Sequence, residues 1–104
     1  MARAEKIYTI IKRSCEPVGR IIEISNTLEA LQNAVKGRIQ AVPVTENVTV
    51  LCDDDGIYNN KLYNCHIHGI DFVGTVLAVG VKGDDFDDVP ITLDEWEDMI
   101  NGKS

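Results

Sequence analysis

A chain of 104 residues with 44% hydrophobic and 26% charged residues has the size and composition of one globular domain, which needs neither a metal nor a disulfide to fold. No apolar run approaches the ~18 residues of a membrane span, and the three cysteines follow neither a disulfide spacing nor a zinc-site spacing. The net charge of −7 is concentrated in residues 53–104, which hold 3 positive and 12 negative side chains, so direct binding to nucleic acid is disfavoured.

The first two predicted strands form a hairpin. Lys6–Lys12 (K-I-Y-T-I-I-K) is β-branched and aromatic, and Arg20–Ile24 (R-I-I-E-I) forms a second short strand. Pro17 and Gly19 between them are turn-forming residues. Because M-A-R-A-E-K leads into the first strand without an apolar signal region, we expect a cytoplasmic location in a bacterial host cell.

Residues 26–37, N-T-L-E-A-L-Q-N-A-V-K-G, predict an amphipathic helix with a signal at each end. Asn26 is the expected N-cap, with Glu29 completing a capping box. Gly37 is expected to supply the left-handed residue at which such helices end. One apolar stripe is expected to pack on a sheet, and it consists of Leu28, Leu31 and Val35.

The next segment predicts a second hairpin. Residues 38–44 form a strand whose Pro43 cannot donate to a ladder, which indicates an edge strand or a strand end. A turn at residues 45–47 leads into a strand at residues 48–52. Residues 53–61 follow as the longest irregular stretch of the chain.

The sequence leaves open whether residues 62–70 form a short strand or an ordered loop. Residues 71–81 are the most continuously apolar segment and predict a central strand covered on both faces. Gly74 and Gly80 within it indicate bulges or a close approach of another backbone.

After a loop at residues 82–90, Thr92 and Glu95 form a second predicted capping box. It opens a helix to Ile100 with Leu93 and Trp96 on the same stripe. The prediction is a single α+β domain over residues 1–104: an antiparallel or mixed five- to six-stranded sheet with two helices packed on it, in the order ββαββ-β-α.

Three blocks of sequence stand in an order typical of one family. They are N-T-L-E-A-L-Q-N-A-V-K-G-R-I-Q-A-V, then C-D-D-D-G, then V-G-T-V-L-A-V-G followed by an acidic loop and L-D-E-W. Over residues 21–100 the chain resembles the mobile-element proteins catalogued as domain of unknown function 3846. This resemblance implies a small accessory protein of phages, plasmids or other mobile elements, with no established reaction.

Members of that family often carry a polar L-P-x-N-R-like stretch after the acidic turn, where this chain reads L-Y-N-C-H. Asn64 matches the asparagine of that pattern. Cys65 stands in the place of the arginine, which weakens the case for a retained anion site of the family.

Residues 57–68 are richer in aromatic and amide side chains than a connector requires. Tyrosine stacking combined with asparagine hydrogen bonds is suited to holding a base or a small polar ligand. The alternative is that the asparagines form a turn and the tyrosines pack. The residues predicted to bind such a ligand, for example a nucleotide, are Tyr58, Asn60, Tyr63, Asn64 and His66.

Asp84, Asp85, Asp87 and Asp88 precede a helix that also begins with acidic residues. Such a run is either a solvated face, favoured in part by the helix dipole, or a phosphate mimic that binds a basic groove on another protein. We therefore hypothesise a non-catalytic accessory protein that binds host machinery or host defence through this acidic surface. The alternative is a small module that sequesters a nucleotide in residues 57–68.

Metal, cofactor and catalytic chemistry find little support in the sequence. His66 and His68 would share one face of a strand with Cys65 on the other, and no second ligand pair follows. The Asp53–Gly56 turn lacks the alternating spacing of a calcium loop. No G-x-S-x-G elbow, P-loop, glycine-rich dinucleotide fingerprint or H-E-x-x-H motif occurs, and Cys65 with His66 cannot form a dyad when adjacent strand residues point apart. We expect no metal, no cofactor and no enzymatic activity.

Overall fold

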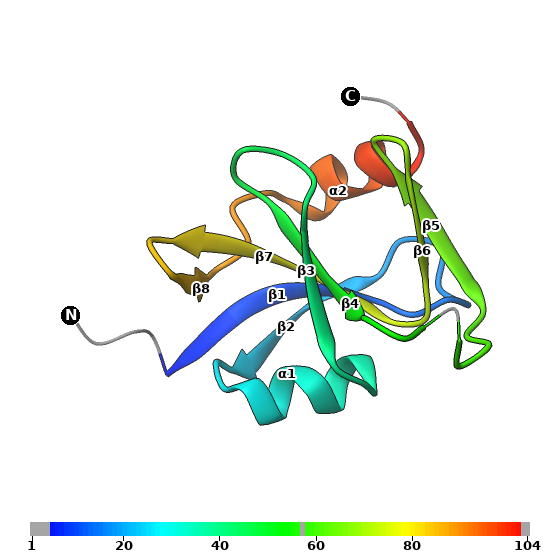
Figure 1. The fold of residues 1–104 in the computed structure, drawn as a ribbon. Helices are drawn as coiled ribbons and strands as arrows, with labels where there is room; N and C mark the ends of the chain where they lie inside the picture. The colour runs from blue at the N-terminus through cyan, green and yellow to red at the C-terminus, as the bar shows by residue number, and fades with distance from the viewer. Residues whose placement is uncertain (1–4, 57, 103–104) are drawn as a thin grey trace.

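The computed structural model describes residues 5–56 and 58–102, which fold into eight strands and two helices (Figure 1). The elements are β1 (Lys6–Lys12), β2 (Arg20–Ser25), α1 (Leu28–Val35), β3 (Ile39–Pro43), β4 (Thr49–Asp53), β5 (Tyr63–Ile67), β6 (Ile70–Val73), β7 (Val76–Lys82), β8 (Asp85–Asp87) and α2 (Leu93–Ile100). Every strand pair is antiparallel. The predicted α+β class is confirmed. No helix in the described ranges is long and apolar enough to cross a membrane.

The main sheet has the order β2-β1-β7-β4-β3, with β8 pairing the far end of β7. Both predicted hairpins, β1–β2 and β3–β4, are confirmed. β3 is an edge strand that ends at Pro43, so the missing N–H of the proline costs the ladder nothing. A second sheet consists of β5 and β6 alone.

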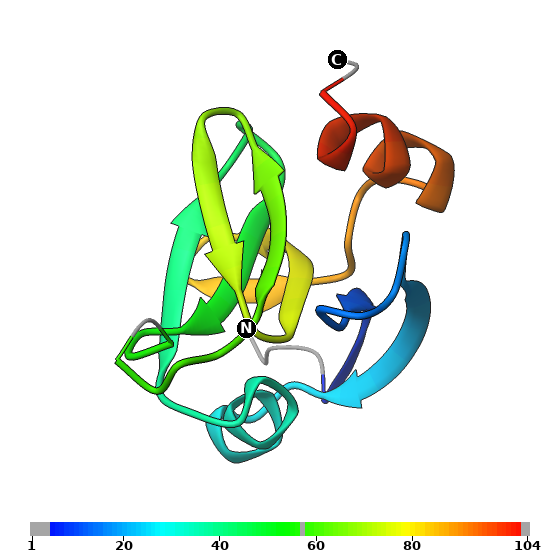
Figure 2. The same ribbon diagram turned by 90° about the vertical axis from the view of Figure 1, so that its right-hand side faces the viewer.

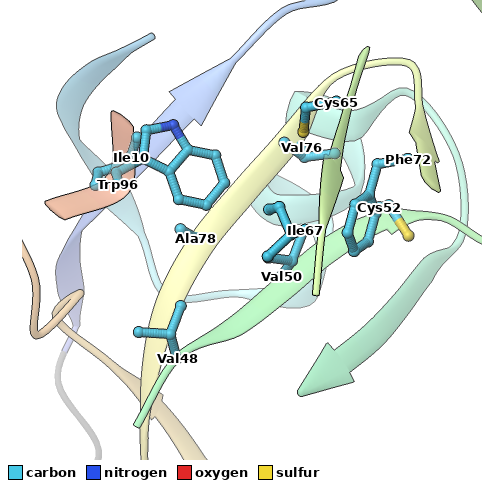
Figure 3. Packing of buried hydrophobic residues seen from close by; sticks show 10 residues of the cluster. All are labelled: Ile10, Val48, Val50, Cys52, Cys65, Ile67, Phe72, Val76, Ala78 and Trp96. Carbon is cyan, nitrogen blue, oxygen red and sulfur yellow. The ribbon is translucent and has the colours of Figure 1, made fainter. Parts of the chain in front are cut away.

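The sheet is covered on both faces, which makes three layers (Figures 1 and 2). Alternate residues of each strand point to opposite faces, so Leu77 of β7 packs toward α1 while Ala78 packs away from it. The α1 layer contributes Leu31 and Val35. The opposite layer is built from the β5–β6 hairpin and α2, as Figure 3 shows for Ile67, Phe72 and Trp96 over Val50, Val76 and Ala78.

Helix α2 follows its prediction closely. Thr92 Oγ1 accepts from Glu95 N at 3.1 Å, and Glu95 Oε1 accepts from Thr92 N at 3.0 Å, which completes the predicted capping box. Trp96 is fully buried, and its indole Nε1–H donates to Val18 O at 2.8 Å. Burial of a side chain of this size stabilises the fold by roughly 2–3 kcal/mol, and the hydrogen bond removes the cost of burying the N–H.

The ends of α1 differ from the prediction by one residue. Thr27 is the N-cap, because its Oγ1 accepts from Ala30 N at 3.2 Å, whereas the amide of Asn26 is buried and donates to Phe86 O. The left-handed residue is Lys36 (φ 60°). Gly37 is required for another reason: a Cβ there would collide with the Asp53 carboxylate.

The prediction of one continuous strand over residues 71–81 is wrong, because this segment forms two strands. Gly74 (φ 73°) breaks it into β6, which pairs with β5, and β7, which lies at the centre of the main sheet. Gly80 does mark a close backbone approach, because a Cβ there would collide with Asp88 O. Residues 62–70, for which the sequence did not decide between a strand and a loop, contain β5. The predicted loop at residues 82–90 contains the short strand β8.

Candidate functional site

Three of the five predicted ligand residues lie together on β5, and two do not join them. Tyr63, Asn64 and His66 line a cavity of about 300 Å³. Tyr58 is 86% exposed and Asn60 adopts φ 56° in the preceding turn, and neither lines this cavity. Ile57, the first residue of the predicted stretch, lies outside the described residues.

The cavity lies between β5 and the C-terminal end of α2, and its third wall is the segment after β1. A second cavity of about 460 Å³ shares His66, Ile100 and Asn101 with the first and extends along the β5–β6 turn. Figure 2 shows the hairpin and α2 side by side, on the side of the molecule opposite α1. We call the two cavities together the β5–α2 groove. Its lining residues are Lys12, Ser14, Glu16, Pro17, Tyr63, Asn64, Cys65, His66, His68, Gly69, Met99, Ile100, Asn101 and Gly102.

Lys12 and Asn64 form a buried polar pair at the base of the groove. Lys12 Nζ donates to Asn64 Oδ1 at 2.7 Å and lies 3.4 Å from Asn64 O and 3.5 Å from Arg13 O. The Asn64 amide donates to Lys12 O at 2.9 Å and to Gly74 O at 2.7 Å. Asn64 therefore joins β1, β5 and the β6–β7 connection, and its amide hydrogens are already used within the protein.

The outward face of the hairpin carries a polar cluster of three residues. His66 and Asp71 are paired across β5 and β6, with Nδ1 and Oδ1 2.7 Å apart. Asp71 therefore orients the imidazole and leaves Nε2 as its other polar atom. Desolvation and the neighbouring Asp71 carboxylate raise the pKa of Tyr63. Both His66 and Tyr63 border the groove.

Cys65 and His66 point to opposite faces, as predicted. Cys65 lies in the core beside Val76 (Figure 3), and burial raises the pKa of its thiol to about 11, against the opposing field of Lys12. Burial, with a smaller effect of the adjacent Asp53, also raises the pKa of Cys52. Neither buried thiol is a nucleophile at neutral pH.

The C-D-D-D-G turn serves a structural role that the sequence did not reveal. Asp53 is buried, and its Oδ2 lies 2.7 Å from Lys61 Nζ and accepts from Asn59 Nδ2 at 3.1 Å. Lys61 Nζ also donates to Val35 O at 2.8 Å and to Lys36 O at 2.9 Å, so one ammonium satisfies carbonyls at the end of α1. In the described part of the chain, no three His, Cys, Asp or Glu side chains gather as a metal site would require.

The four predicted partner-binding residues lie on and beside β8. Asp84 and Asp88 are exposed, and Asp85 and Asp87 are half-buried. Asp88 Oδ1 accepts from Tyr8 N at 2.8 Å, and Asp87 Oδ1 accepts from Asp88 N at 2.8 Å. The Asp88 carboxylate thus helps to join the end of β8 to β1, and the Asp87 bond is local. The side chains of Asp84 and Asp85 make no hydrogen bond to the described residues.

Comparison with known proteins gives a family but no named relative. The family model described as "Domain of unknown function (DUF3846)" matches residues 7–101. No curated protein and no solved structure matches the chain.

Proposed function

This chain belongs to the DUF3846 family, and on that premise we propose that it is a non-catalytic accessory binding protein of a phage or other mobile element. Its partner is a host protein with a basic surface. The acidic segment, which we define as residues 84–98, makes the contact. A carboxylate surface of this kind competes with nucleic-acid phosphates for such a partner.

The observation that carries this proposal is the lack of internal counter-charges along the acidic segment. Elsewhere in the described ranges, Glu16, Asp53, Asp54 and Asp55 pair with Arg20, Arg38 or Lys61, and the carboxylates without an ion pair, such as Glu29 and Glu46, stand singly in the sequence. None of the carboxylates of the segment forms an ion pair with a cation of the described residues. Their field is therefore directed outward, toward solvent or a partner. They are Asp84, Asp85, Asp87, Asp88, Asp94, Glu95, Glu97 and Asp98.

The proposal of a non-catalytic role is supported by the thiols and by the histidine. The two buried cysteines are held as neutral thiols by burial. His66 is oriented by Asp71, but among the described residues neither a serine nor a cysteine is hydrogen-bonded to its ring. Among the described residues, His66 and Asp71 thus supply a base and an orienting group without a nucleophile beside them, which supports the proposal.

The test is capture of the partner with tagged protein, followed by measurement of its affinity for variants. Asp84→Asn with Asp85→Asn should weaken binding about tenfold at low salt, because two unpaired charges are lost without loss of a hydrogen bond. Duplex DNA should displace the partner. The matched control is Glu29→Gln with Glu46→Gln, which removes the same charge from exposed positions outside the segment. Equal affinity of both double variants would contradict the proposal.

The second candidate function is a small-molecule or nucleotide-binding module, and the β5–α2 groove favours it. Its two cavities, of about 300 and 460 Å³, fall in the size range of small-ligand sites. Tyr63 on its rim is 56% exposed and offers a ring face for stacking.

A thermal-shift screen against cyclic and linear nucleotides tests this second candidate. A ligand that binds only the folded state raises the melting temperature. Tyr63→Ala should abolish the rise, whereas Tyr58→Ala should retain it, because Tyr58 is exposed outside the groove. A screen without any shift would count against this candidate and would leave the acidic-surface proposal untouched.

A further inference from the structure

Lys12 is a buried cation that faces only uncharged acceptors. It is 3% exposed, and its ammonium contacts Asn64 Oδ1, Asn64 O and Arg13 O. No carboxylate of the described residues lies within ion-pair distance of it. Buried charges are normally paired, because an ammonium loses several kcal/mol of hydration on leaving water. The half-buried Lys61 follows that rule, because its ammonium pairs with the buried Asp53 carboxylate.

The cavity in front of Lys12 offers no unpaired carboxylate among its lining residues. Glu16 is the one carboxylate among its lining residues, and it is committed elsewhere: Oε2 pairs with Arg20 at 2.8 Å and Oε1 accepts from Arg13 N at 3.0 Å. The other polar groups at the cavity are not anions, and the hydrogens of Ser14 and Asn64 are already donated to backbone carbonyls. These polar groups belong to Ser14, Tyr63, Asn64, His66 and Asn101.

We infer that the β5–α2 groove binds a small molecule through an oxyanion, a phosphate or a carboxylate, placed against the Lys12 ammonium. This inference rests on the second candidate function and names the chemical class of its ligand. The oxyanion supplies the counter-charge that Lys12 lacks, in a site where low exposure strengthens the attraction. The C-terminal end of α2 borders the groove at Asn101 and carries partial negative charge, so the anion lies on the β5 side.

The experiment compares salts at constant ionic strength. The wild-type melting temperature is measured in sodium phosphate, in sodium acetate and in sodium chloride, and then with AMP and with adenosine. A saturable rise of roughly 5–10 °C is expected at ten times the Kd of the better oxyanion, and none is expected with chloride. Phosphate acting without acetate assigns a phosphate ligand, and the reverse assigns a carboxylate ligand.

Lys12→Met removes the ammonium and keeps an unbranched side chain, and it should abolish the rise. The matched control is Lys82→Met, which removes one positive charge from an exposed position at the end of β7 and should leave the rise unchanged. Because loss of Lys12 leaves Asn64 Oδ1 without its donor, the variant is destabilised. NMR of the wild type provides a test without any variant: phosphate or acetate should shift the Lys12 Hε and Asn64 Hδ2 signals and leave those of Lys82 in place.

Three results would each overturn the inference. The first is equal stabilisation by chloride and the oxyanions. The second is the lack of any response of the Lys12 signals to either oxyanion. The third is a rise with AMP that Lys12→Met retains in full. In this third case the groove binds a ligand and the second candidate function stands, but the oxyanion of the ligand does not contact Lys12.

Discussion

At the scale of single residues, two backbone positions are occupied by side chains that disfavour them. Lys36 ends α1 at φ 60°, and His68 with Gly69 forms a two-residue hairpin turn at φ 48° and 84°. Glycine and asparagine are the preferred residues at left-handed positions, because a larger side chain crowds the backbone there. His68 also lines the β5–α2 groove, so the groove and the turn share a strained residue.

Lys36→Gly should raise the free energy of unfolding by about 1 kcal/mol. Lys36 is exposed and its side chain forms no ion pair with the described residues, while its carbonyl still accepts from Lys61. Urea titration should show a higher midpoint with an unchanged slope. Lys36→Ala is the control, because it removes the same charge and keeps a Cβ. If alanine stabilises as much as glycine, backbone strain is not the cause.

The thiols should react in an order set by burial. Cys15 is exposed, whereas Cys52 and Cys65 are buried, and with a pKa of about 11 only about one Cys65 in a thousand is a thiolate at pH 8. A thiol reagent such as DTNB should therefore titrate one cysteine quickly in the folded protein and all three in urea. Rapid reaction of three thiols without denaturant would contradict the burial of the other two.

At the scale of elements, the sequence predicted the helix and strand features that depend on neighbouring residues. The features that differ from the prediction depend on contacts between residues that are distant in sequence. The capping box at Thr92 is local, and α2 begins there as predicted. Asn26 was the expected cap of α1 by composition, but Phe86, 60 residues away, offers its carbonyl to the Asn26 amide, so Thr27 caps instead. The sequence of residues 26–37 gives no sign of this distant hydrogen bond.

The same reasoning explains the strands and the site. A continuous apolar run cannot tell one buried strand from two, and only the left-handed turn at Gly74 separates β6 from β7. Grouping aromatic and amide residues by proximity in sequence selected Tyr63, Asn64 and His66, which line one cavity. Lys12 lines the same cavity from β1, but it carries no local motif, so there was no reason in the sequence to group it with them.

Asp53 and Lys61 join the end of β4 to the end of α1, and this link should make stability depend on pH. Burial alone would raise the pKa of the Asp53 carboxyl, but hydrogen bonds from Lys61, Asp55 N and Asn59 outweigh it and hold the pKa below its usual 3.8. A depressed folded-state pKa contributes stability above the unfolded value, and that stability is lost as the pH falls through the folded value.

The wild type should therefore exceed Asp53→Asn by about 2 kcal/mol in unfolding free energy at pH 7. The difference should shrink progressively below pH 3.8, the usual carboxyl value. Urea titrations of both proteins at pH 7 and at pH 3 measure it. Asp54→Asn is the control, because Asp54 forms only an exposed pair with Arg38. A gap that is constant with pH would show that the Asp53 charge does not stabilise the fold.

At the scale of the whole molecule, the two faces of the sheet depend on the same strands. Leu77 and Val79 of β7 pack toward α1, while Val76 and Ala78 pack toward α2 and the β5–β6 hairpin. β7 pairs with both β1 and β4, so neither face can lose its packing without disturbing the ladder that supports the other. The groove, formed by the layer opposite α1, is therefore supported in part by residues that do not line it.

This arrangement predicts one cooperative unfolding transition that a distant probe detects. Leu31→Ala, on the α1 face, should lower the unfolding free energy by about 2–5 kcal/mol, because it leaves a cavity in a closely packed layer. Trp96, the single tryptophan, lies on the opposite face and reports through its fluorescence. In Leu31→Ala, the urea midpoint measured by tryptophan fluorescence should fall as far as the midpoint measured by far-UV circular dichroism.

Leu28→Ala is the matched control on the same helix, because Leu28 is 63% exposed and should change stability by no more than about 0.5 kcal/mol. If Leu31→Ala shifts the circular dichroism midpoint and leaves the tryptophan midpoint in place, the two layers unfold separately, and the groove does not depend on α1.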